Sequence, residues 1–132
     1  MIARPFRLRR SFEFARVRSH GCSSSTRLLV VAILPNNLER NRFGFVVGKR
    51  VGKAVARNRV RRQLREAIKT LEPWLRKGYD VVIVARGPIA SPEVTFKELL
   101  ETIRSSSGRV GLLLDNRAIK ERPQQSSQGA PQ

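Results

Sequence analysis

The sequence predicts a single domain of mixed helices and strands, in which helices cover a β-sheet. A continuous apolar run at 28–34 and a second, largely apolar run at 79–85 have the length and composition of buried strands. Between them, apolar residues recur at positions 60, 64, 67, 68 and 71, which is the spacing of one face of a helix. At 132 residues, the chain is long enough for one hydrophobic core and short for two domains.

The first part of the chain is expected to hold a short helix and two strands. Apolar residues between positions 8 and 17 roughly follow helical spacing, with Ser11 as a candidate cap and Gly21 as a stop. A polar stretch at 22–26 leads into the first apolar run, which ends before Pro35. The turn-rich segment 36–41 and the β-prone segment 43–47 then predict an antiparallel hairpin with a long loop.

The best-defined helix begins after Gly52 and is interrupted by Pro73. A short turn at 74–75 separates it from the second apolar run, so strand, helix and strand form a crossover unit. A last helix carries apolar residues between 94 and 103. We expect Ser91 or Thr95 to cap it and the Ser-Ser-Ser-Gly at 105–108 to stop it.

The composition changes near the C-terminus. Beyond position 114 the chain is dominated by Gln, Ser, Pro and charged residues, which bury too little apolar surface to fold. We therefore expect one domain at 1–114 and a disordered tail at 115–132.

The charge of the chain is strongly unbalanced. Lys and Arg number 27 against 10 Asp and Glu, for a formal net charge of +17. Such self-repulsion favours a polyanionic partner, either nucleic acid or an anionic membrane. No apolar run approaches the length of a membrane span and no secretory signal is recognised, so we expect no membrane partner. The single Cys22 excludes an internal disulfide and indicates a reducing compartment, so a cytoplasmic protein is expected.

One segment concentrates the positive charge without any acid. Residues 49–65 read KRVGKAVARNRVRRQLR. Because a helix turns about 100° per residue, several polar residues fall on one face beside the apolar stripe. These are Asn58, Arg61, Arg62, Arg65 and Lys69. Guanidinium groups match phosphate oxygens and stack on bases, so this face favours RNA. The alternative is a merely solvated face, which the repulsion between uncompensated cations makes costly.

The residues give no sign of an enzyme site. The segment 48–54 follows a strand and opens a helix, as a phosphate loop does. It is one residue short between its glycines, however, and has Ala54 where a hydroxyl would coordinate magnesium. His20 is the only histidine and the acids are scattered, so no nucleophile, base and orienting acid come together. We therefore expect no catalytic residue, no protein-held metal and no small-molecule substrate.

The basic segment resembles the bacterial ribonuclease P protein subunit. The family signature is a strand ending in a basic pair, followed by Gly, Ala-Val, Arg-Asn-Arg, another basic pair and a further Arg. This sequence carries it as Lys49-Arg50, Gly52, Ala54-Val55, Arg57-Asn58-Arg59, Arg61-Arg62 and Arg65. The segments 8–21 and 79–86 also resemble the family's first helix and last strand, so the resemblance covers about 8–114.

The resemblance implies an α+β fold and a role in tRNA processing. The sheet, antiparallel or mixed, would be packed by helices in the order α-β-β-α-β-α. It would contain a left-handed βαβ crossover, as in the second domain of ribosomal protein S5, against the usual right-handed rule. The protein would be a subunit of an endonuclease whose catalytic RNA, with Mg²⁺, removes the 5′ leader from precursor tRNA. The protein would assist this hydrolysis without performing it.

The resemblance also implies two RNA-binding regions. The catalytic RNA would contact Lys49, Arg50, Lys53, Arg57, Asn58, Arg59, Arg61, Arg62 and Arg65. The single-stranded leader would bind in a cleft between the first helix and the sheet, where the family has aromatic residues on which bases stack. Phe14 matches one of these, with core packing as the alternative for its side chain. Arg18 and Ala32 stand where relatives often have further aromatics, which predicts a cleft that depends more on charge.

Two other functions stay open on the sequence alone. One is a non-catalytic RNA-binding module such as a ribosomal protein, and the signature around Asn58 argues against it. The other is an autonomous nuclease, and the missing catalytic constellation argues against that. Incubating the protein with precursor tRNA, with and without the catalytic RNA, separates all three functions.

Overall fold

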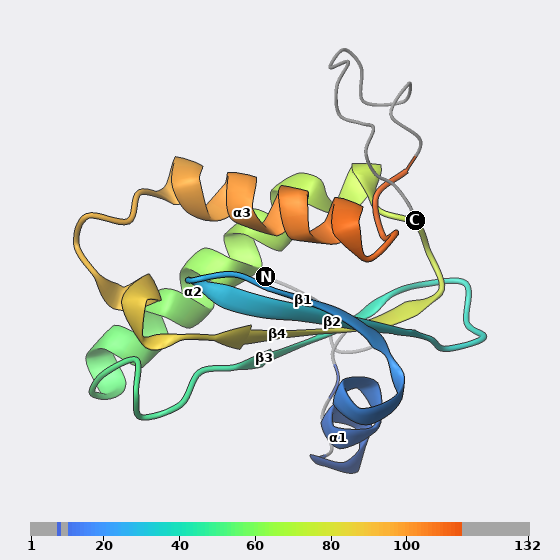
Figure 1. The fold of residues 1–132 in the computed structure, drawn as a ribbon, viewed down its shortest axis with the longest axis horizontal. Coiled ribbons are helices and arrows are strands. Elements are labelled where there is room, and N and C mark those ends of the chain that lie inside the picture. The colour runs from blue at the N-terminus through green and yellow to red at the C-terminus, as the bar shows by residue number, and fades with distance from the viewer. Residues whose placement is uncertain (1–7, 9–10, 115–132) are drawn as a thin grey trace.

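The computed structural model describes residue 8 and residues 11–114 of the chain (Figure 1). Its main elements are α1 (Ser11–His20), β1 (Cys22–Ser25), β2 (Leu29–Pro35), β3 (Arg42–Val46), α2 (Ala54–Leu71), β4 (Tyr79–Ala85) and α3 (Phe96–Arg109). Two short 3₁₀ helices, η2 (Glu72–Trp74) and η3 (Gly87–Ala90), flank β4. The expected tail at 115–132 lies outside the described residues, as do positions 1–7 of the expected domain.

The strands form one mixed sheet in the order β1-β2-β4-β3. β2 pairs antiparallel with β4, and β3 pairs parallel with β4. The predicted hairpin between the first apolar run and 43–47 is therefore wrong, because β4 lies between these two strands. Val81, Val82 and Ile83 of β4 are all buried, so the strand is covered on both faces and takes a central place in the sheet.

The true hairpin joins β1 to β2, and β1 is missing from the predicted order of elements. β1 reads Cys-Ser-Ser-Ser and lies largely exposed at the edge of the sheet. It has none of the apolar alternation by which a strand is recognised. Its pairing with β2, from Cys22 opposite Ile33 to Ser25 opposite Val30, comes from the backbone. The observed order is α-β-β-β-α-β-α.

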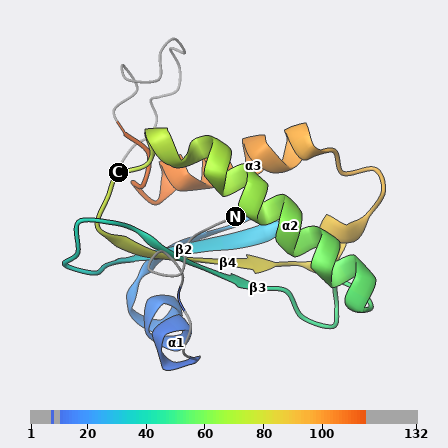
Figure 2. The same ribbon diagram turned by 180° about the vertical axis from the view of Figure 1, so that it is seen from behind.

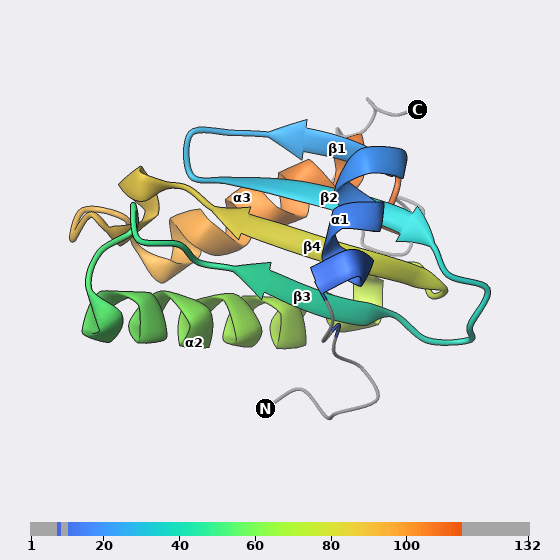
Figure 3. The same cartoon turned by 90° about the horizontal axis from the view of Figure 1, so that it is seen from below.

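The β3–α2–β4 unit connects two parallel neighbours. Figure 3 shows β3 and β4 running in the same direction, with α2 on the far side of the sheet. Traced from β3 through α2 to β4, the path is a left-handed crossover. This is the uncommon hand for such units, and the one that the family resemblance implies.

The helices cover the two faces of the sheet unequally. α2 and α3 lie on one face, while α1 alone crosses the other (Figures 1 and 2). The alternation of β2 sends Leu29, Val31 and Ile33 into the main core beneath α2 and α3, and Ala32 into a smaller cluster beneath α1. Because α1 is short, it covers one part of its face, and no other helix of the described residues lies on that face (Figure 3).

α2 has the apolar stripe that the sequence predicts. Its buried residues are Val60, Leu64, Ala67, Ile68 and Leu71. The helix ends at Leu71, and the turn expected after Pro73 is η2. Within the described part of the chain, no helix is long and apolar enough to cross a membrane.

α3 begins as predicted and ends later than predicted. Thr95 is its N-cap, and the hydroxyl of Thr95 accepts a hydrogen bond from the backbone N of Glu98 at 3.0 Å. The helix runs through 105–108 because the serines at 106 and 107 are small enough to be buried in its packed face. It stops at Gly111, whose φ is +84°, and the Leu112 N–H bonds the Ser107 carbonyl at 2.8 Å. This is a Schellman ending, for which glycine is the preferred residue.

A buried carboxylate ties α1 to the sheet. Arg42 of β3 donates from Nε and Nη2 to the two carboxylate oxygens of Asp80, at 2.9 and 2.8 Å. Its Nη1 donates to Glu13 of α1 at 3.2 Å. Asn36 adds a bond to Asp80 Oδ1 at 3.0 Å. The hydrogen bond from Arg42 to Asp80 raises the pKa of Arg42, an effect that its partial burial opposes.

Removal of this carboxylate should destabilise the domain. In Asp80→Ala, the half-buried Arg42 loses two charge-assisted hydrogen bonds, so we expect the free energy of unfolding to fall by about 3 kcal/mol. Urea denaturation measures the loss. The matched control is Glu101→Ala, which breaks the more exposed Glu101–Arg104 pair and should cost less than about 1 kcal/mol. Equal losses in the two variants would show that the buried carboxylate has no special role.

Candidate nucleic-acid interface

The outer surface of α2 carries most of the predicted RNA-binding residues. All six of those on the helix reach solvent, at least in part. They are Arg57, Asn58, Arg59, Arg61, Arg62 and Arg65. None of the ion pairs found among the described residues involves a cation of α2. The one acid on the helix, Glu66, is exposed. The described chain therefore leaves the charge of this surface uncompensated.

Helix geometry divides these cations between two flanks of α2. Arg59 lies near η3, where its Nη2 donates to the Ala90 carbonyl at 3.4 Å. Arg57, Arg61 and Arg65 follow at four-residue intervals on the other flank, which faces away from η3. Figure 3 shows α2 running along the β3 side of the sheet, so this second flank forms a row of arginines at that side of the molecule.

The arginine row has few internal hydrogen bonds. Arg61 Nη1 donates to Asn58 Oδ1 at 3.3 Å, which orients the guanidinium and leaves its charge intact. The Nε of Arg57 is buried and has no hydrogen-bond partner among the described residues, while its side chain as a whole is partly exposed. The parts of these side chains that reach solvent can donate to oxygens of a ligand, and phosphate is the group that guanidinium forks match best.

The turn between β3 and α2 extends the basic surface. Its cations are all exposed, and they are Lys49, Arg50 and Lys53. Two backbone hydrogen bonds of 3.1 Å hold the turn, from Val51 N to the Gly48 carbonyl and from Gly52 N to the Lys49 carbonyl. Gly52 has a φ of +146°, a conformation that side-chain-bearing residues rarely adopt. The structure thus brings all nine predicted residues to one helix and the turn that leads into it.

Phe14, predicted for the second region, lies between α1 and the sheet. It is partly buried and packs against a cluster of Leu8, Val17, Ala32 and Val82. Its ring lies over Gly44 of β3, where an added Cβ would stand 2.5 Å from the ring atoms Cε2 and Cζ. The sequence analysis did not single out Gly44, although a glycine inside a strand signals the close approach of another group.

Partly buried apolar residues lie beside Phe14 on this sheet face. Val46 and Val84 are partly buried and flank the cluster under α1. Arg18 is exposed one helical turn after Phe14, at the end of α1. Phe12, on the same helix, is 63% exposed. Phe14 therefore has packing contacts on the sheet and an accessible part, so the structure accommodates both of the roles considered for it.

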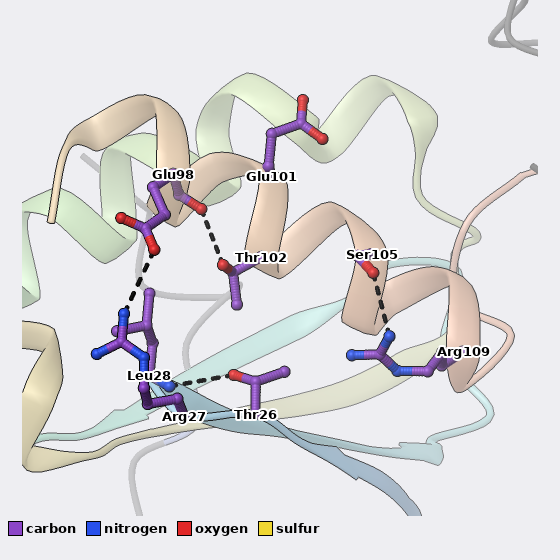
Figure 4. A pocket seen from close by; sticks show the side chains of 8 residues that line it. All are labelled: Thr26, Arg27, Leu28, Glu98, Glu101, Thr102, Ser105 and Arg109. Atoms are coloured by element: carbon purple, nitrogen blue, oxygen red, sulfur yellow. Dashed lines mark hydrogen bonds and ion pairs between the residues drawn. The ribbon is translucent and has the colours of Figure 1, made fainter.

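A hollow beside α3 also contains arginines, but these have hydrogen-bond or ion-pair partners within the fold. It has a volume of about 350 Å³ and lies between the start of β2 and α3 (Figure 4). Arg27 pairs with Glu98 at 3.5 Å. Arg109 donates to the hydroxyls of Ser24 and Ser105, at 2.9 and 3.2 Å. These guanidinium groups are engaged within the fold, so this hollow is a weaker candidate for binding a polyanion.

The described acids do not form a metal site. Glu13 and Asp80 are bound to Arg42, and Glu98 and Glu101 are paired with arginines. In the part of the chain that the structure describes, no group of three or more His, Cys, Asp or Glu gathers as metal ligands would. The described residues therefore do not fit a protein-held Mg²⁺.

A small basic α+β domain that presents an uncompensated cationic helix is typical of RNA-binding proteins. A family model described as Ribonuclease P matches residues 2–111 of the chain. The chain belongs to this family, as the sequence motif indicated. It is a ribonuclease P protein component, part of a tRNA-processing ribonucleoprotein, and it has an RNA partner.

Relatives and solved structures agree with this assignment. The chain is 46% identical to the ribonuclease P protein component of Caldanaerobacter subterraneus, over 74% of this chain and 84% of the relative. It is 39% identical to that of Roseiflexus sp., over 85% and 91%. The ribonuclease P protein from Thermotoga maritima superposes with a TM-score of 0.69 at 29% identity, over 75% of this chain and 92% of that chain.

The contact between Gly44 and Phe14 gives a testable prediction. In Gly44→Ala, the new methyl group meets the Phe14 ring, so we expect the free energy of unfolding to fall by about 1 to 3 kcal/mol. In a Phe14→Ala background the same substitution should cost much less, because the obstructing ring is gone. A double-mutant cycle in urea measures the coupling. Additive losses would mean that the ring does not rest on Gly44.

Proposed function

We propose that the chain binds the catalytic RNA of ribonuclease P through the basic surface of α2 and its preceding turn. The observation that carries this proposal is that no ion pair among the described residues involves a cation of this surface, where the exposed Glu66 is the single acid of the helix. Elsewhere in the described chain, Arg27, Arg42 and Arg104 each have a carboxylate partner. The helix with the most cations has none within the described residues, so its charge is available for the phosphates of an RNA partner.

We further propose that the 5′ leader of precursor tRNA binds on the sheet face beside α1. Phe14 offers the accessible part of its ring there, and Arg18 adds a positive charge one turn later. Single-stranded nucleic acid favours such a combination of an aromatic platform and nearby cations. Ala32 is 2% exposed beneath α1, so it supplies no second platform. Stacking in this region would therefore depend on Phe14.

In this proposal the protein positions RNA and the RNA performs the hydrolysis. The described residues offer no catalytic constellation, and their acids are engaged with arginines or dispersed. Mg²⁺ would be held by RNA phosphates and would supply the activated water for cleavage of the leader. We place this activity in the cytoplasm, since the single exposed Cys22 suits a reducing compartment.

Reconstitution tests the proposal as a whole. Precursor tRNA is incubated with the protein, with the catalytic RNA transcribed from the same genome, and with both together. We expect cleavage at the mature 5′ end that requires the RNA and is strengthened by the protein at modest salt. Cleavage by the protein alone would contradict the proposal, and binding without any effect on cleavage would favour an RNA-binding module of another kind.

The α2 surface is tested by the salt dependence of binding. Arg62→Ala and Arg65→Ala should each weaken binding to the catalytic RNA and reduce the slope of log K against log salt concentration by about 0.7 to 0.9, the value for one phosphate contact. Filter binding at several salt concentrations measures both effects. Lys77→Ala removes an exposed charge outside α2 and should leave the slope nearly unchanged. An unchanged slope in both arginine variants would count against direct phosphate contacts.

The leader site is tested with Phe14→Leu, which keeps an apolar side chain in the α1 cluster and removes the aromatic face. We expect the affinity of the reconstituted particle for leader-bearing tRNA to fall by about 1 to 3 kcal/mol, with binding of mature tRNA unaffected. Phe12→Leu, at a much more exposed position on the same helix, is the control. Equal losses for both tRNAs would assign Phe14 to packing alone.

A further inference from the structure

A pocket on the η3 flank of α2 is not accounted for by phosphate binding. Its volume is about 400 Å³, which is in the range of small-ligand sites. α2 provides one wall, and η3 with the loop leading to α3 provides the other. The lining residues are Arg59, Gln63, Ile89, Ala90, Ser91, Pro92 and Val94.

The two walls of the pocket differ in chemistry. Arg59 and Gln63 of α2 bring a guanidinium and a carboxamide, which carry hydrogen-bond donors and one acceptor in planar groups. Arg59 uses one donor, Nη2, in a long hydrogen bond of 3.4 Å to the Ala90 carbonyl, so a base edge would contact its other donors. On the η3 side, Pro92 and Val94 provide a smaller apolar surface, and Ile89 lies buried beneath it. A planar, polar-edged and apolar-faced ligand matches this arrangement, and a nucleobase has this character.

The approach to the pocket is also unusual. Val55 is 80% exposed, in the first turn of a helix whose solvent face is polar and mostly cationic. Val55, Arg59 and Gln63 recur at four-residue intervals, so they form one ridge along α2 that leads into the pocket. An exposed valine gains nothing from phosphate, but it provides apolar contact for a base or ribose that lies over the ridge.

We propose that this pocket binds an unpaired nucleobase of the RNA partner. Gln63 and Arg59 would hydrogen-bond the edge of the base, since Gln and Arg are the side chains that pair with base edges in two-point contacts. The apolar wall would lie against the base face, and Val55 would contact the adjoining nucleotide. The inference rests on the proposed RNA-binding role of α2. It assigns a base contact to the η3 flank of the helix, whereas the arginine row on the opposite flank would contact phosphates.

Charge favours a nucleotide over other occupants of the pocket. Arg59 lines it, and Arg62 and Lys53 are exposed on the same helix and the turn before it. No acid lines the pocket. An acidic peptide would also be attracted, but the proposed RNA brings a high density of phosphates to this surface and would displace it. The backbone of the RNA would be held by the cations while one base enters.

The test measures binding of the full chain to the catalytic RNA transcribed from the same genome. Gln63→Met keeps the length and helix propensity of the side chain and removes its hydrogen bonds. We expect affinity to fall roughly 5- to 150-fold, the range for the loss of a base-edge contact. The salt slope should not change, because Gln63 carries no charge. Thr70→Ala, a neutral position two turns further along the same flank of α2, is the matched control and should bind like the parent chain.

A second readout identifies the base. Chemical probing of Watson–Crick edges in the bound RNA should show an unpaired nucleotide protected by the parent chain and by Thr70→Ala, and reactive again with Gln63→Met. Unchanged affinity and unchanged protection in Gln63→Met would overturn the inference while leaving RNA binding by α2 intact. A parent chain that does not bind the RNA at all would instead overturn the proposed function. Thermal unfolding of each variant checks that the fold is retained.

Discussion

The burial of the α2 stripe against the sheet is the constraint on which the rest depends. Five apolar residues of this helix are buried, and Val60, Leu64 and Ala67 are fully enclosed. Once that stripe is buried, the helical period fixes the directions in which the intervening polar side chains point. Arg62 must point away from the core, and Arg61 and Arg65 must lie along its flank. The same packing energy that stabilises the domain therefore holds several like charges together at the surface, in a geometry that their repulsion opposes.

Several arginines elsewhere in the domain have carboxylate or hydroxyl partners among the described residues, in contrast to those of α2. Arg42 is engaged on both sides, with Asp80 at 2.8 Å and Glu13 at 3.2 Å, and it fastens α1 to the sheet. Arg27 and Arg109 are engaged around the hollow at α3. Arginines that join elements of the fold therefore have carboxylate or hydroxyl partners, whereas the arginines of α2 have no carboxylate partner among the described residues. Even Glu66, the one acid of α2, forms no ion pair with these cations among the described residues.

Much of this was predictable from the sequence, and the failures have physical causes. The helix at α2 and the buried strands β2 and β4 follow from apolar periodicity, which reports burial directly. Sheet order does not, because periodicity contains no information on which strands are neighbours, and so β4 was not expected between β2 and β3. β1 was not predicted because a polar edge strand is held by backbone hydrogen bonds, which leave no pattern in the side chains. The end of α3 was misplaced because the glycine that reverses the chain is Gly111, and Gly108 lies within the helix.

The proposed binding residues were predictable as a set, but their distribution between the two flanks of α2 was not. Sequence placed Arg57 to Arg65 on one helix, while the separation of Arg59 and Gln63 toward η3 depends on a loop far along the chain.

The central claim, that the α2 arginines contact RNA, is tested most directly by modification of arginines with phenylglyoxal, read by mass spectrometry with and without the catalytic RNA. Protection of Arg57, Arg61, Arg62 and Arg65, with Arg27 and Arg109 still reactive, is the result predicted. Unchanged reactivity along α2 in the bound state would contradict it.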